Sequence, residues 1–220
     1  MDNCNSEPYK NLKEEDFVYL IEYIDICYRW VDFVDEEAME KISKLVESNK
    51  SFSQWLKEYI FSDSYRLYVG ESFNEEDAKK IPEVGKIVEQ KGNKCHHWTT
   101  NWNSAIAKSE YENRESTNQI GGMIGSNPYN PIKNTHVVAD MHRLFKFLVS
   151  EKYADDVKTL EGSSKFGKKF TDGIDRFLYA EKKVKADNEV ITSGNVKLYE
   201  VEATWKVDEE TNSVEVNGSW

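Results

Sequence analysis

Residues 186–201 constrain the fold most, because they place two carboxylates at the start of an apolar, strand-like segment. Asp187 and Glu189 are two positions apart, and a Ser-Gly-Asn turn further along leads into a second strand. Because side chains alternate across a strand, the two acids are expected to share one face. Two acids on one face repel each other and tend to titrate as a pair. The alternative interpretation is a solvated strand end before a hairpin.

The composition predicts a folded protein with an acidic surface. Of the 220 residues, 39% are hydrophobic and 13% are aromatic, which is enough to build a core and excludes a disordered chain. The 40 acids against 29 bases give a formal net charge of −11. Such a charge repels nucleic acid and anionic lipid and favours basic partners. We therefore expect no nucleic-acid partner.

The chain shows no sequence signal for export or for membrane insertion. Its first residues lack a basic region followed by an apolar stretch. No apolar run approaches the roughly 20 residues that span a bilayer. The cysteines, Cys4, Cys27 and Cys95, are scattered, which is typical of proteins in a reducing cytosol. We therefore expect a cytoplasmic location and no membrane partner.

The order of the periodic segments predicts an α+β fold with an N-terminal helical subdomain, 1–61, and a core, 62–220. Ser51 or Ser53 is expected to cap the third N-terminal helix. The glycine-rich stretch 112–134 is expected to be a long loop. Apolar residues three and four apart predict helices at 14–30, 35–46, 51–60, 103–111, 141–149 and 166–179. Strands are predicted at 65–70, 84–88, 98–100, 136–139, 189–191, 196–201, 203–207 and 214–216.

Three polar motifs lie on separate strands of the predicted core. The first contains an arginine near tyrosine and glycine, the second contains two threonines after a tryptophan, and the third is the acid pair. Together they supply the candidate site residues Arg66, Tyr68, Gly70, Trp98, Thr99, Thr100, Asp187 and Glu189. The run Cys95-His96-His97 has no zinc-like spacing to other ligand types, so no metal site is expected.

Taken together, these motifs resemble the mono-ADP-ribosyltransferases of the arginine–serine–glutamate class, of toxin and tailed-phage type. The first motif of that family matches YRLYVGESF at 65–73. Its Ser-Thr-Ser strand, reached through a hairpin, matches VGKIVEQKGNKCHHWTTNWNSAIAKSEY at 84–111. Its Glu-x-Glu motif, followed by an apolar strand and a turn, matches ADNEVITSG at 186–194. The order and approximate spacing agree over 52–201.

The resemblance implies a mixed β-sandwich core that cleaves NAD and transfers ADP-ribose to a macromolecular acceptor. If the protein is phage-encoded, the acceptor would be a host molecule in the host cytoplasm. The resemblance also implies roles for individual residues. Glu189 would stabilise the positive charge that develops on the ribose, and Asp187 would orient or deprotonate the acceptor. Arg66 would hold an NAD phosphate, Thr99 would brace Glu189, and Trp98 or Tyr68 would stack on a ring.

Three residues depart from the family's pattern. Val69 replaces the arginine in one register of the first motif, Asn101 replaces the third residue of Ser-Thr-Ser, and Asp187 is one methylene shorter than glutamate. The alternative is a catalytically inactive protein of the same fold, using its acidic surface as an inhibitor or anti-defence interaction protein. A toxin of unrelated hydrolytic chemistry is a third hypothesis, for which the sequence offers no nucleophile–base set.

Overall fold

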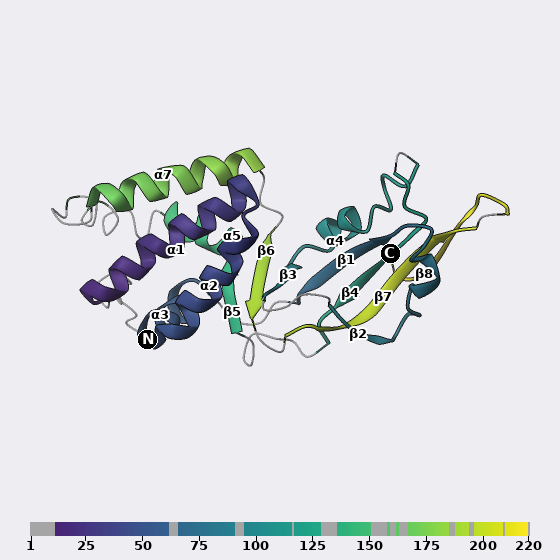
Figure 1. Ribbon diagram of the computed structural model, residues 1–220, viewed down its shortest axis with the longest axis horizontal. Helices are drawn as coiled ribbons and strands as arrows, with labels where there is room; N and C mark the ends of the chain where they lie inside the picture. Colours follow the sequence, from purple (N-terminus) through teal and green to yellow (C-terminus); the bar gives the residue numbers. More distant parts are fainter. Residues whose placement is uncertain are drawn as a thin grey trace, which may run out of the picture. The chain divides into compact units, whose positions relative to one another are not determined.

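The computed structural model describes residues 12–61, 66–90, 95–115, 117–128, 136–150, 158, 162, 167–184, 188–193, 196–208 and 210–219. The predicted α+β class is confirmed, because N-terminal helices precede an antiparallel sheet with interspersed helices (Figure 1). The chain divides into two compact units, Met1–Ser62 with Val137–Ala186 and Asp63–His136 with Asp187–Trp220. The first unit therefore combines the N-terminal helices with a later segment that the sequence pattern assigns to the core.

The helical unit is held together by aromatic side chains on the apolar faces of its helices. The ring centroids of Phe17 and Phe170 lie 5.2 Å apart, which joins the first and last helices of the unit. Trp55 meets Phe147 edge to face, with centroids 5.7 Å apart. The elements are α1 (Glu14–Phe33), α2 (Glu36–Ser48), α3 (Lys50–Tyr59), β5 (His136–Asp140), α5 (Met141–Leu148) and α7 (Gly167–Val184). Within the described residues, no helix is both long and apolar enough to cross a membrane.

The predicted cap of the third helix is wrong. Helix α3 begins at Lys50, directly after Asn49, so Ser51 lies inside the helix. The Ser51 hydroxyl instead donates a 2.6 Å hydrogen bond to the buried Asp16 carboxylate of α1. A serine near a helix start therefore satisfies a buried acid on a neighbouring helix, which local sequence does not reveal.

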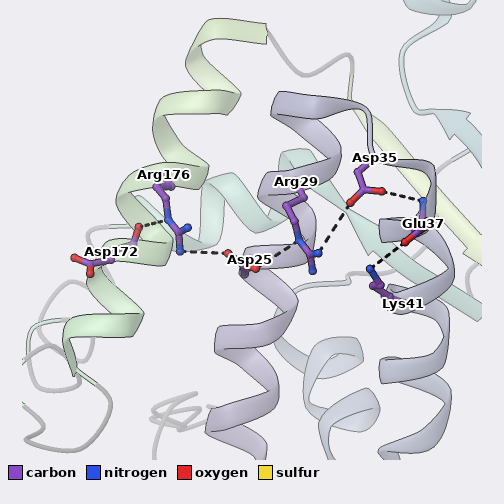
Figure 2. Close-up of polar contacts among 7 residues, drawn as sticks. All are labelled: Asp25, Arg29, Asp35, Glu37, Lys41, Asp172 and Arg176. Atoms are coloured by element: carbon purple, nitrogen blue, oxygen red, sulfur yellow. Dashed lines mark hydrogen bonds and ion pairs between the residues drawn. The ribbon is translucent and has the colours of Figure 1, made fainter.

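A series of ion pairs connects the surfaces of α7, α1 and α2 (Figure 2). Arg176 Nη2 lies 3.2 Å from Asp25 Oδ1, and its Nε donates to the backbone oxygen of Asp172 at 3.1 Å. Arg29 continues the series, because its Nε lies 3.5 Å from Asp25 Oδ2 and its Nη1 lies 4.0 Å from Asp35 Oδ2. Because exposed ion pairs contribute about 0–1 kcal/mol each, the buried aromatic contacts stabilise this unit more.

The second unit is an antiparallel sheet whose strands run in the order β2-β7-β4-β1-β3-β6, with β8 also paired to β7. Among the described residues of 186–201, the two strands do not pair with each other: β6 pairs with β3, and β7 pairs with β2, β4 and β8. The strands are β1 (Tyr68–Phe73), β2 (Ile87–Glu89), β3 (Cys95–Thr99), β4 (Gly121–Ser126), β6 (Glu189–Ser193), β7 (Leu198–Val207) and β8 (Val214–Gly218). Helix α4 (Trp102–Lys108) follows β3.

The loop predicted at 112–134 is wrong for Gly121–Ser126, which forms the fully buried strand β4. The glycines of this strand make room for large aromatic rings. A Cβ on Gly125 would lie 2.1 Å from the Tyr199 ring, and a Cβ on Gly122 would lie 2.3 Å from Trp205 Nε1. The two aromatic side chains are themselves fully buried. Glycine in a strand marks close approach here, not a turn.

We expect Gly125→Ala to destabilise the protein by about 1–3 kcal/mol, because the added methyl group overpacks the Tyr199 ring. Gly173→Ala is the control, since Gly173 lies in α7 with its nearest neighbour 3.8 Å from the added Cβ. That variant should gain roughly 0.5–1 kcal/mol from helix propensity. Urea denaturation measures both. A Gly125→Ala protein as stable as the wild type would contradict the packing argument.

Candidate functional site

Three of the predicted site residues form a row across neighbouring strands of the sheet. Tyr68 of β1 lies opposite Thr99 of β3, and Thr99 lies opposite Glu189 of β6. Directly opposed residues on antiparallel strands share one face, with Cβ atoms about 4.5–5.5 Å apart. The hydroxyl-bearing strand and the acid, which are 90 positions apart in the sequence, are therefore brought together on one face of the sheet.

A cleft of about 300 Å³ lies beside this row. Within the part of the chain that the structure describes, β1 pairs with β3 at Tyr68 alone, whereas it pairs with β4 along its whole length, so β1 and β3 separate beyond that point. The lining includes Tyr68, His97, Thr99 and Lys108. Its volume is at the lower end of small-molecule sites, so it would hold only part of a dinucleotide.

Glu189 adjoins the cleft through His97. Its Oε1 lies 3.1 Å from His97 Nδ1, and the side chains are 17% and 37% exposed respectively. His97 is itself a lining residue, and its backbone oxygen accepts a 2.7 Å hydrogen bond from Gln90 Nε2. A mostly buried carboxylate thus contacts a lining imidazole whose own backbone carbonyl is hydrogen-bonded.

The two threonines connect β3 to its neighbours. Thr99 Oγ1 accepts a 3.0 Å hydrogen bond from the backbone nitrogen of Asn101. The Asn101 side chain in turn accepts from Asn103 N and so caps α4. Thr100 donates its backbone N–H to the oxygen of Asn188 at 3.2 Å. Asn101, which departs from the Ser-Thr-Ser pattern, therefore has a local structural role as a helix cap.

Arg66 lies near the row in sequence, but its guanidinium pairs with Glu202 of β7. Its Nη2 is 2.8 Å from Glu202 Oε1 on β7, and the same carboxylate accepts a hydrogen bond from the buried Ser126 hydroxyl. Strands β7 and β6 lie on opposite sides of β1 in the sheet order. Among the described residues, the structure brings Thr99 and Glu189 together but pairs Arg66 elsewhere.

The remaining predicted site residues have mainly structural surroundings. Trp98 is fully buried, and its Nε1 donates to Thr192 Oγ1 at 2.9 Å. Tyr68 is half-buried and meets Trp102 edge to face at 5.3 Å. At Gly70 a Cβ would lie 2.0 Å from the backbone oxygen of Ala105, so only glycine allows α4 to pack there. Of these side chains, Tyr68 is the one exposed enough to meet a ligand ring.

Two further expectations from the sequence concern Asp187 and a metal site. Asp187 lies outside the described residues. Among the residues that the structure describes, no group of three or more histidine, cysteine, aspartate or glutamate side chains is arranged to hold a metal ion.

Sequence patterns missed His97, Gln90 and Lys108 as site residues. His97 is two positions before Thr99, so strand alternation puts both side chains on one face. The sequence prediction began this strand at residue 98, whereas β3 begins at Cys95 and therefore includes His97. Lys108 is the last residue of α4 and Gln90 directly follows β2, and only the tertiary fold brings both to the cleft.

The comparisons with known proteins give no family for this chain. No protein-family model, no curated protein and no solved structure matches it.

Next to His97 is a buried histidine that should make stability depend on pH. His96 is 2% exposed, and its Nδ1 is buried without a hydrogen-bond partner among the described residues. Burial lowers the pKa of His96, and Lys197 and His97 add smaller effects in the same direction. The unfolded chain therefore binds the proton more readily, and stability is lost as the pH falls below the usual histidine pKa of about 6.5.

We expect His96→Leu to reduce this loss. The wild type should lose at most about 1.4 kcal/mol per pH unit from this one proton, and the variant should lose correspondingly less between pH 7.5 and pH 5. Urea unfolding at both pH values gives the difference for each protein. Identical pH dependence in the two proteins would show that His96 is not buried as a neutral group.

Proposed function

We propose that this protein is a mono-ADP-ribosyltransferase that cleaves NAD and transfers ADP-ribose to a macromolecular acceptor. One observation carries the proposal: Glu189 lies opposite Thr99 on adjacent strands, next to a cleft that Thr99 lines. This is the pairing of acid and hydroxyl strand that the resemblance in the sequence implies. The acceptor would be a protein or other macromolecule, such as a host component if the protein is phage-encoded.

Cleavage of NAD requires a fixed carboxylate beside the ribose. The bond between the ribose C1′ and the nicotinamide nitrogen breaks, and its electron pair leaves with neutral nicotinamide. The ribose then carries oxocarbenium-like positive charge, which Glu189 would stabilise. A lone pair of the acceptor forms the new bond to C1′, and the acceptor's proton passes to a base. The proposal assigns Asp187 as the base that accepts this proton.

The finer assignment of a β-sandwich, ADP-ribosyltransferase-like core is also part of this proposal. It is supported by the divergence of β1 and β3 beyond the Tyr68–Thr99 pair, which opens the sheet where the motifs meet. Tyr68 would stack on a ring of NAD, Gly70 would keep α4 close to β1, and Thr100 would hold the segment that leads into Glu189. Trp98, being fully buried, would support the site from within the core.

In this proposal Lys108, as well as Arg66, is a candidate for the contact with an NAD phosphate. Lys108 is an exposed cation that lines the cleft, whereas Arg66 is engaged by Glu202. For Arg66 to hold a phosphate, it would first have to leave that carboxylate. The Lys108 ammonium already lies at the cleft, so it would attract a phosphate without such a rearrangement.

We expect Glu189→Gln to lower NAD cleavage by about 10²–10³-fold, because the amide removes the charge that stabilises the ribose cation. Incubation with labelled NAD, alone and with cell lysate, measures hydrolysis and label transfer. Glu215→Gln, an exposed change on β8, is the matched control and should retain wild-type activity. The proposed function fails if the wild type gives neither hydrolysis nor transfer, or if Glu189→Gln equals the wild type.

We expect Lys108→Ala to weaken NAD binding about 10-fold, which corresponds to about 1.4 kcal/mol for a lost charge–phosphate contact. Binding of nicotinamide riboside, which has no phosphate, should not change. Lys206→Ala, an exposed change on β7, is the control. Titration calorimetry with both ligands measures the effect. A loss of NAD affinity in Arg66→Ala, and not in Lys108→Ala, would show that Arg66 contacts the phosphate and Lys108 does not.

A second candidate is a catalytically inactive protein of the same fold that binds a basic partner. The Arg66–Glu202 pair favours it, because this contact removes from the cleft the arginine that the family pattern requires. The net charge of −11 suits a basic partner. Salt-sensitive binding of one basic protein, together with no NAD affinity, would support this candidate over the enzyme.

A further inference from the structure

The contact between His97 and Glu189 is the most specific polar pairing beside the cleft. The two residues are diagonal neighbours on β3 and β6, since His97 lies opposite Ile191 and Glu189 lies opposite Thr99. Their side chains meet on the same face, with 3.1 Å between His97 Nδ1 and Glu189 Oε1. An ionised carboxylate only accepts hydrogen bonds, so Nδ1 must be the nitrogen that carries the proton and donates it.

We propose that His97 is a positioning residue that donates its Nδ1–H to Glu189 and fixes the carboxylate for chemistry in the cleft. The inference rests on the proposed function and adds a residue to it. Glutamate has three rotatable side-chain bonds, and fixing such a side chain costs rotamer entropy. A preorganised partner supplies that order before the substrate arrives.

The surroundings make His97 a rigid donor. Its backbone is held in the β3–β6 ladder, and its carbonyl accepts from Gln90 Nε2 at 2.7 Å. The Thr99 hydroxyl, which the resemblance assigns to brace Glu189, accepts a hydrogen bond from the backbone of Asn101. The imidazole provides a hydrogen bond to Glu189 of the kind that the resemblance expects from a hydroxyl.

Two side chains of opposite charge line the cleft next to the pair. Glu71 and Lys108 line the same cleft and carry opposite charges. Glu71 also accepts from the Tyr199 hydroxyl at 3.1 Å. On the neighbouring position of the strand, burial lowers the pKa of His96, so that side chain adds no positive charge at neutral pH. The hydrogen bond from His97 orders the carboxylate, whose negative charge would stabilise the ribose cation.

Two amide variants separate positioning from other roles of the imidazole. The Nδ2 of asparagine occupies roughly the place of histidine Nδ1, whereas the Nε2 of glutamine occupies that of histidine Nε2. His97→Asn should therefore keep the hydrogen bond to Glu189 and most of the activity. His97→Gln should lower kcat for NAD hydrolysis on the order of 10- to 100-fold, with KM little changed. Thermal unfolding of both variants shows whether the fold is retained.

With an active wild type, two results would overturn the inference and leave the proposed function standing. Either both variants match the wild type, or both lose activity equally while remaining folded. Equal loss would indicate a direct proton-transfer role that neither amide can replace.

Nitrogen-15 NMR of the His97 ring tests the pair without any substrate. We expect the Nδ1–H tautomer in the wild type and its loss in Glu189→Ala. An Nε2–H tautomer in the wild type would overturn the inference. If the wild type neither binds nor cleaves NAD, the proposed function and the catalytic use of the pair fail together, while the tautomer still shows whether His97 holds Glu189.

Discussion

The candidate site depends on a single backbone pairing, that of Tyr68 with Thr99. On one side of this point β1 is bound to β4 over six residue pairs, and on the other side β3 is bound to β6 over five. Among the described residues, the two halves of the sheet meet at this one pair, beyond which β1 and β3 separate. Because the pairing sets which residues face each other, it brings the Thr99 and Glu189 side chains to the edge of the cleft.

Close packing on both faces of β1 and β4 keeps this meeting point in place. Helix α4 approaches β1 so closely that its backbone occupies the space of a side chain at Gly70. Glycines on β4 likewise admit the rings of Tyr199 and Trp205, which come from β7. Since interiors tolerate little added volume, these glycines fix the distance between layers. The positions of α4 and therefore of Lys108 follow from that packing.

The choice of partner by each charged group decides what the cleft can do. Arg66 pairs with Glu202 across β4, so a cation that the resemblance would place with the acid is bound instead to a carboxylate of β7. His97 pairs with Glu189 beside the cleft. Together with Thr99 and the exposed Lys108, which line the cleft, this acid supplies the groups that the proposed stabilisation of a sugar cation requires.

Local patterns were enough to predict the main elements and the fold class, because apolar spacing of three and four, or of two, depends on near neighbours. They predicted α1, α2, β6 and the acid Glu189 at the start of a strand. They did not reveal that the glycine-rich run is the buried strand β4, that Arg66 meets Glu202, or that His97 meets Glu189. These outcomes depend on strand order and register between segments far apart in the chain, and no local pattern encodes them.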